Sequence, residues 1–154
     1  MAKTYDKGMK GMPMEINYSD LIRQAFAARE KAYAPYSGFM VGAALLTAEG
    51  DVYSGCNVEN AAFSPTNCAE RTAFFKAVSE GRRRFSAIAV VGGRTGTGLD
   101  DVEYVFPCGV CRQVMAEFCG ESFMIVTAKS TSDYRTYTLR ELLPEAFGPD
   151  DLEV

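Results

Sequence analysis

The amino-acid sequence predicts an α/β fold: a three-layer α/β/α domain around a mixed five-stranded sheet. The chain has 154 residues, of which 47% are hydrophobic, so it is long enough to bury one core. Segments of helical periodicity alternate with short apolar runs, which is typical of helices that cover both faces of a sheet. No internal repeat or change of composition marks a second domain.

The first element is a helix that follows a polar lead-in. Residues 1–16 show no sustained hydrophobic period, so we expect a mobile lead-in before a single domain over residues 17–154. Ser19 or Asp20 can cap the helix, in which apolar residues then recur at helical spacing. Pro35 is expected to end the helix at about the preceding residue.

A hairpin and a second helix come next. Residues 39–46 and 51–55 are predicted as paired strands, because an Ala-Glu-Gly-Asp turn separates two strand-like runs. Residues 56–67 are polar and predict a loop. Residues 68–81 contain strong helix formers and finish on a glycine, which favours a helix that stops there.

The second half of the sequence predicts three more strands and a helix. Residues 86–91 form a continuous apolar run and indicate a buried strand. Residues 92–106 are rich in glycine and predict a long loop. A third helix is expected over 108–119, directly after a proline, and further strands over 123–127 and 136–139.

The composition excludes several classes of function. The chain has no histidine, which removes the Ser-His-Asp triad, the Cys-His pair and every imidazole-ligated metal site. Sixteen basic against 20 acidic residues give a net charge of −4, so neither nucleic acid nor an anionic membrane is an expected partner. No run reaches the roughly 18 apolar residues of a membrane helix. We expect a cytoplasmic location, where closely spaced cysteines serve as metal ligands or catalysts more often than as disulfides.

Three cysteines stand at predicted helix starts. Cys108 and Cys111 form a CxxC pair, which places both sulfurs on one side of a first helical turn. Cys68 opens another helix, where the positive end of the helix dipole favours a thiolate. Three thiolates around Zn²⁺ leave a fourth position open for water, which is the arrangement of a catalytic zinc site.

Two other interpretations of the cysteines stay open on spacing alone. A lone CxxC in an α/β protein can be a redox pair. Alternatively, Cys56 or Cys119 completes a structural site with four cysteine ligands.

Two segments resemble the zinc signature of the cytidine deaminases, specifically their small homotetrameric branch. They read NCAERTAFFKA at 67–77 and PCGVCRQV at 107–114. Further matches cover nearly everything after residue 16: YAPYSGF at 33–39, VGAAL at 41–45, NVEN at 57–60 and LLPEAF at 142–147.

The resemblance implies a zinc-dependent cytidine deaminase. Such an enzyme hydrolyses cytidine and deoxycytidine to uridine and deoxyuridine, with release of ammonia, in pyrimidine salvage. The matching ligands of one Zn²⁺ per chain are Cys68, Cys108 and Cys111. Glu70 matches the proton carrier between the attacking water, ring N3 and the leaving amine, and Arg71 matches an arginine that donates hydrogen bonds to the ligand sulfurs.

The resemblance also implies the contacts to substrate. Asn57 and Glu59 match residues that bind the ribose hydroxyls, Phe39 matches the ring that stacks on the pyrimidine, and Ala69 also belongs to the nucleoside site. Phe147 matches a residue that a neighbouring chain contributes, so a homotetramer with shared active sites is expected.

One geometric condition accompanies this assignment. On an ideal helix Cys68 and Glu70 lie roughly 200° apart, so both can approach one metal only if Cys68 sits at the helix cap, outside helical geometry.

Two competing functions have distinguishable signs. Enzymes that deaminate a modified nucleoside, such as the blasticidin-S deaminases, usually lack the pattern found here at 57–60. A zinc-stabilised binding module needs no open metal position, and a nucleic-acid editing subunit is expected to show a basic, strand-tracking surface.

Overall fold

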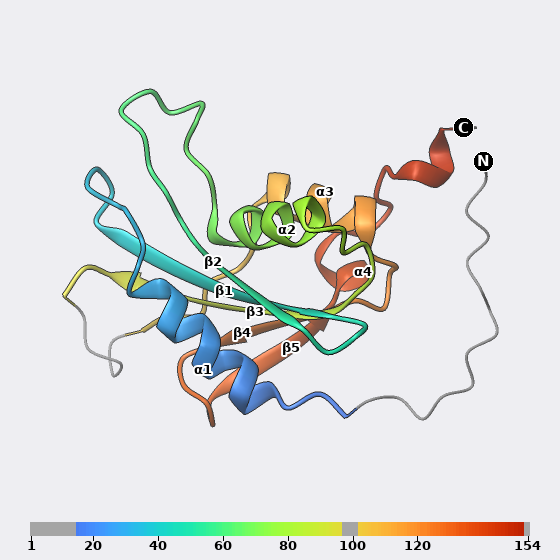
Figure 1. Ribbon diagram of the computed structural model, residues 1–154, viewed down its shortest axis with the longest axis horizontal. Coiled ribbons are helices and arrows are strands. Elements are labelled where there is room, and N and C mark those ends of the chain that lie inside the picture. Colours follow the sequence, from blue (N-terminus) through green and yellow to red (C-terminus); the bar gives the residue numbers. More distant parts are fainter. Residues whose placement is uncertain (1–14, 97–101, 153–154) are drawn as a thin grey trace.

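The computed structural model describes residues 15–96 and 102–152, and in this part of the chain helices cover both faces of one sheet. Helix α1 (Tyr18–Arg29) covers one face, and α2 (Ala69–Ser79) and α3 (Gly109–Phe118) lie together over the other (Figure 1). The three-layer α/β/α prediction is therefore confirmed. The first 14 residues of the expected lead-in lie outside the described residues.

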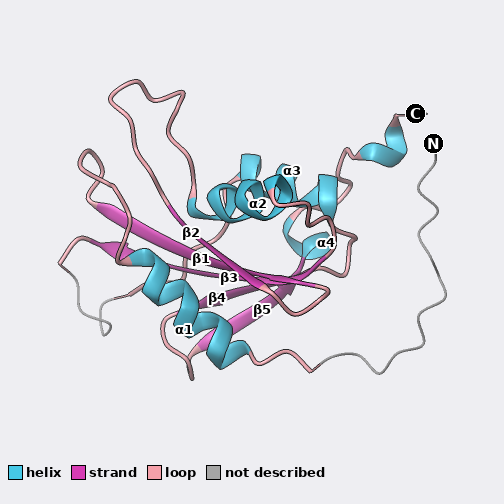
Figure 2. Cartoon of the chain, in the orientation of Figure 1, coloured by secondary structure: helices cyan, strands magenta, loops and turns pink. Residues whose placement is uncertain are grey.

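The sheet has five strands and is mixed, as the sequence predicts. Its order is β2-β1-β3-β4-β5; β3 and β4 run parallel and the other neighbours run antiparallel (Figure 2). The parallel pair requires a crossover, which the segment containing α3 supplies. The strands are β1 (Phe39–Thr47), β2 (Val52–Cys56), β3 (Phe85–Arg94), β4 (Met124–Ala128) and β5 (Tyr134–Thr138).

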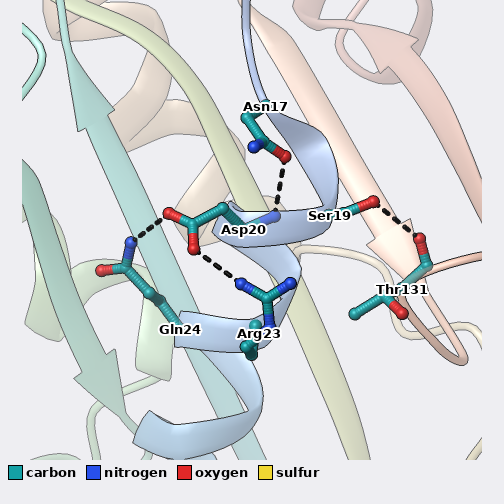
Figure 3. Close-up of polar contacts among 6 residues, drawn as sticks. All are labelled: Asn17, Ser19, Asp20, Arg23, Gln24 and Thr131. Atoms are coloured by element: carbon teal, nitrogen blue, oxygen red, sulfur yellow. Dashed lines mark hydrogen bonds and ion pairs between the residues drawn. The ribbon is translucent and has the colours of Figure 1, made fainter.

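The start of α1 differs from the prediction. Asn17 is the cap residue, because its side-chain oxygen accepts a hydrogen bond from the Asp20 backbone N–H at 3.0 Å (Figure 3). Ser19, one of the two predicted caps, instead donates from Oγ to the Thr131 carbonyl at 3.1 Å. This bond ties α1 to the hairpin between β4 and β5.

Helix α1 also ends earlier than predicted, at Arg29 instead of about residue 34. The cause is a competing backbone pairing with the segment after β2. The Tyr33 N–H donates to the Asn57 carbonyl at 3.0 Å, and the Tyr33 carbonyl accepts from the Glu59 N–H at 2.8 Å. Residues before Pro35 are thereby held outside the helix.

Two boundaries in the second half are corrected as well. Strand β3 continues to Arg94, because Gly92 and Gly93 pair with Val41 and Met40 of β1, so the predicted loop begins after residue 94. Residues 97–101 of that loop lie outside the described residues. The last strand ends at Thr138, whose side chain caps the short helix α4 (Leu139–Leu142) in a capping box.

Two glycines let the helices approach the sheet closely. A Cβ on Gly42 would lie 2.0 Å from the Ala25 carbonyl oxygen of α1. A Cβ on Gly55 would lie 2.5 Å from both the Ala69 carbonyl oxygen and the Ala73 nitrogen of α2. The start of α2 is therefore seated directly on β2. Among the described helices, none combines the length and the hydropathy that crossing a membrane requires.

Candidate active site

Two of the three cysteines at the predicted zinc site occupy helix caps. Cys68 precedes α2 with φ −75° and ψ 157°, and Cys108 precedes α3 with φ −68° and ψ 168°. Both residues have extended backbone, and neither side chain is used to cap its own helix. Cys68 thus meets the condition that allows it and Glu70 to approach one metal ion.

The three sulfurs have the spacing of a tetrahedral zinc site. Cys108 Sγ lies 3.5 Å from Cys111 Sγ and 3.8 Å from Cys68 Sγ, and all three sulfurs lie within 4.8 Å of one another. Zn–S bonds of about 2.3 Å in a tetrahedron require sulfur–sulfur distances of about 3.8 Å. The donor set therefore fits Zn²⁺ with three protein ligands.

The remaining cysteines lie apart from this cluster. Cys56 donates from Sγ to the Lys31 carbonyl at 3.4 Å, and Cys119 is buried in the core between the sheet and α2–α3. Among the described residues, the group that can hold a metal contains three cysteines and no fourth. The structure therefore favours an open site over a structural site with four cysteines.

Arg71 faces the cluster from the first turn of α2. Its Nη2 donates to Cys68 Sγ at 3.2 Å, and its buried Nε has no hydrogen-bond partner among the described residues. Three thiolates and Zn²⁺ sum to −1, so a guanidinium here offsets the excess negative charge. The hydrogen bond from Cys111, followed by that from Arg71, lowers the pKa of Cys68 to about 5 although burial opposes the shift. The pKa of the Cys111 thiol is raised by the neighbouring Cys68 and by burial.

Glu70 lies buried against the same cluster. The side chain is 4% exposed, and Cys111 Sγ donates to its Oε2 at 3.7 Å. Burial, assisted by the negative charge on Cys68, raises the pKa of Glu70 to about 7. A carboxyl group with a pKa near neutrality can both accept and donate a proton at working pH.

The sheet extends beyond the start of α2 and carries Phe39. Gly55 lies under the first turn of α2 and pairs with Ala43, four residues along β1 from Phe39. Four strand residues span about 13 Å. The Phe39 ring rests over Gly92 of β3, where an added Cβ would come within 3.1 Å of its Cε1 atom. Phe39 therefore lies on the α2–α3 side of the sheet, past the helix start that carries the cysteines.

Asn57 is held by the backbone of β1, a contact that sequence reasoning missed. Its Oδ1 accepts from the Val41 N–H and its Nδ2 donates to the Phe39 carbonyl, both at 2.8 Å. The side chain thereby fixes the first residues of β1. An amide has further hydrogen-bonding capacity beyond one bond at each end.

Glu59 lies beside the turn before β1. Its Oε1 accepts from the backbone N–H groups of Tyr36 at 2.9 Å and Ser37 at 3.1 Å. Hydrogen bonds from Ser37, assisted by the one from Tyr36, lower the pKa of Glu59. The carboxylate is therefore ionised, and both backbone bonds use the same oxygen.

The predicted residues separate into three groups in space. Cys68, Cys108, Cys111, Glu70 and Arg71 form one cluster around the starts of α2 and α3, with buried Ala69 between Cys68 and Glu70. Phe39, Asn57 and Glu59 lie around the start of β1. Phe147 is 59% exposed near the C-terminus and belongs to neither group.

Comparisons with known proteins agree with this geometry. Residues 16–127 match the family model described as the cytidine and deoxycytidylate deaminase zinc-binding region. The chain is 53% identical over 137 residues to a cytidine deaminase of Sporosarcina psychrophila, covering 89% of this chain and 96% of that protein. It is 52% identical over 132 residues to a cytidine deaminase of Halalkalibacterium halodurans, covering 86% of this chain and 95% of that protein.

Solved structures show the same likeness. The crystal structure of cytidine deaminase from Burkholderia pseudomallei has a TM-score of 0.74 and 51% identity, covering 83% of this chain and 97% of that one. The crystal structure of cytidine deaminase from Mycobacterium tuberculosis has a TM-score of 0.73 and 39% identity, covering 87% of this chain and 99% of that one.

Proposed function

The chain belongs to the cytidine and deoxycytidylate deaminase family, and we propose that it hydrolyses cytidine and deoxycytidine with Glu70 as the proton carrier. The overall reaction takes one water and releases uridine, or deoxyuridine, and ammonia. The observation that carries the proposal is the buried Glu70 carboxyl, 3.7 Å from a sulfur of a three-cysteine cluster that fits Zn²⁺. This arrangement combines an open metal position with a proton carrier beside it.

The chemistry divides between the metal and Glu70. Zn²⁺ held by Cys68, Cys108 and Cys111 supplies activation of the attacking water, because it lowers the pKa of that water. Glu70 accepts the proton that the water loses on adding to C4 and delivers it to ring N3. Glu70 then carries the second proton from the new hydroxyl to the exocyclic amine. The C4–N4 bond breaks, ammonia leaves, and C4 becomes a carbonyl.

Arg71 and the two helix starts hold the charge balance. The Arg71 guanidinium donates to Cys68 Sγ, and the starts of α2 and α3 add partial positive charge near Cys68 and Cys108. Both effects counter the surplus negative charge of three thiolates around one Zn²⁺. We assign Arg71 to tuning the metal site, with no proton transfer of its own.

The nucleoside occupies the sheet surface beyond the start of α2 in this proposal. The Phe39 ring is available there for stacking on the pyrimidine, and buried Ala69 lies between the proton carrier and a ligand. Glu59 is ionised and has one carboxylate oxygen outside its backbone bonds, which suits a ribose hydroxyl. Asn57 holds β1 and has hydrogen-bonding capacity left for a second hydroxyl.

We further propose that residues 17–154 act as one domain in a homotetramer whose sites are shared through Phe147. Support comes from the exposure of Phe147, which leaves its ring free to contact a neighbouring chain. A role in pyrimidine salvage follows from free nucleosides as substrates. A cytoplasmic location suits five free cysteines, three of which must stay reduced to bind metal.

The activity is tested by incubating the zinc-loaded protein with cytidine or deoxycytidine and following ultraviolet absorbance and ammonia together. We expect both nucleosides to be converted with one ammonia per uracil formed. Free cytosine serves as the control for the ribose contacts and should react far more slowly. Absence of turnover with both nucleosides in zinc-loaded protein would overturn the proposal. Faster turnover of a modified nucleoside than of cytidine would instead favour deamination of modified nucleosides as the function.

Sharing of the site is tested by mixing Phe147→Ala, which we expect to be impaired, with Glu70→Ala, which we expect to be inactive. Phe147→Ala lacks the stacking face and Glu70→Ala lacks the proton carrier, so a hybrid can unite an intact Glu70 with an intact Phe147 from the other parent. The variants are unfolded and refolded together, and cytidine turnover is compared with each refolded alone. Turnover no greater than the sum of the separate samples, with mixed tetramers verified by mass spectrometry, would refute the shared site.

A further inference from the structure

Two side chains directly after Cys111 connect α3 to the C-terminal segment. Arg112 Nε donates to the Pro107 carbonyl at 2.8 Å, and its Nη1 donates to the Leu142 carbonyl at the end of α4. Gln113 Nε2 donates to the Phe147 carbonyl at 2.8 Å. The helix turn that carries two of the zinc ligands thus also holds the backbone of Phe147.

The C-terminal segment has little else to fix its path. Leu142 and Leu143 pack against the core, whereas residues 144–147 are all exposed. Among hydrogen bonds between described residues, the bond from Gln113 is the one that joins residues 144–148 to a helix or strand outside the C-terminal segment. The hydrogen bond from Gln113 therefore restricts the conformations that this exposed segment can adopt, and its loss would release them.

We propose that Gln113, assisted by Arg112, is a positioning residue that holds Phe147 at a set distance from the metal centre of its own chain. The inference rests on the proposed function, in which Phe147 completes the nucleoside site of a neighbouring chain. Cys108 caps α3, and Cys111 and Gln113 lie within it, so one helix sets the spacing between the metal centre of a chain and the ring that serves the neighbouring site.

Gln113 and Arg112 differ in what their loss affects. Arg112 bonds the carbonyl of Pro107, directly before Cys108, so its replacement disturbs a zinc ligand as well as the C-terminal segment. The hydrogen bond of Gln113 goes to Phe147 alone. Gln113 is therefore the cleaner probe of positioning, and a change at this residue should leave the zinc site intact.

Replacing Gln113 should weaken substrate binding and leave the metal in place. For Gln113→Ala we expect KM for cytidine to rise about three- to tenfold, with kcat within about twofold of wild type, as loss of one hydrogen bond implies. Zinc content should stay at one per chain. Gln113→Glu, which keeps the length and removes the donor, should behave like Gln113→Ala. Glu117→Ala, on an exposed position one turn further along α3, is the matched control and should leave KM unchanged.

A double-mutant cycle decides whether Gln113 acts through Phe147. If it does, Gln113→Ala should raise KM no further in the Phe147→Ala background, because the ring that it positions is already gone. An unchanged KM in the single variant, the full effect persisting in the Phe147→Ala background, or loss of zinc would each overturn the positioning role. A Phe147→Ala variant that binds cytidine like wild type would instead refute the proposed shared site itself, and the positioning role with it.

Discussion

Arg71→Gln removes the positive charge beside the zinc ligands and keeps a polar side chain. In the structure Arg71 Nη2 donates to Cys68 Sγ at 3.2 Å, and three thiolates with Zn²⁺ carry a net charge of −1. A hydrogen bond to a charged group contributes about 1.5–3 kcal/mol, which corresponds to roughly 10- to 150-fold in a binding constant. Loss of a residue that supports metal ligands typically costs about 10- to 100-fold in metal affinity. We therefore expect zinc affinity to fall about 10- to 100-fold.

The assay is competition for zinc between the protein and a chromophoric chelator at neutral pH. Arg23→Gln is a suitable control, since Arg23 is an exposed arginine on α1 that pairs with Asp20 and lies outside the site. At saturating zinc, Arg71→Gln should recover occupancy while turnover stays below wild type, because the charge at the metal is altered. Zinc affinity within twofold of wild type would show that the Arg71–Cys68 contact does not support the metal.

Three other predictions concern the metal and the seating of α2. In metal analysis, Cys56→Ser should keep one zinc per chain and Cys68→Ser should lose it, because Cys56 lies outside the cluster. Equal loss of zinc in both variants would favour a closed site with four cysteine ligands. Gly55→Ala should destabilise the fold by about 1–3 kcal/mol or more in urea unfolding, since its Cβ would lie 2.5 Å from the backbone of α2. Gly120→Ala is the control and should change stability little, because a Cβ there meets open space. Equal stability of both variants would contradict the close approach of α2 to β2. Removal of zinc by a chelator should abolish turnover and lower Tm, and added Zn²⁺ should restore both; turnover that persists without metal would contradict a zinc mechanism.

The sequence predicts the layers and the starts of α2 and α3 well because both depend on local patterns. Alternating helical and strand periodicities indicate the three layers, and cysteines at helix starts indicate the metal cluster. The condition that Cys68 must sit at a cap follows from helix geometry alone, and its ψ of 157° confirms it. These features need no information about distant segments.

The boundaries that sequence reasoning misplaced depend on long-range pairing. Helix α1 stops at Arg29 because Tyr33 pairs with backbone from the segment after β2. Gly92 reads as loop from its type, yet pairing with Val41 keeps it in β3. The same limit applies to the site, because no local pattern shows that Asn57 braces β1.

Contacts of Gln113 were also missed, although a signal was present. Arg112 and Gln113 are the last polar residues of the PCGVCRQV motif, and neither is needed as a zinc ligand or proton carrier. Their partners, Leu142 and Phe147, lie about 30 residues further along the chain. Only the folded chain shows that the metal-binding helix also holds the C-terminal segment.

Glu70→Gln tests the central claim most directly, because the amide keeps the shape of the carboxyl and cannot carry a proton. The variant should bind one zinc per chain and unfold at a Tm close to that of wild type, since a neutral side chain suits the buried position. Cytidine turnover should fall at least about 100-fold, in keeping with the usual contribution of a general acid–base group. Turnover within a few-fold of wild type in the zinc-loaded variant would contradict the account and remove Glu70 from the mechanism.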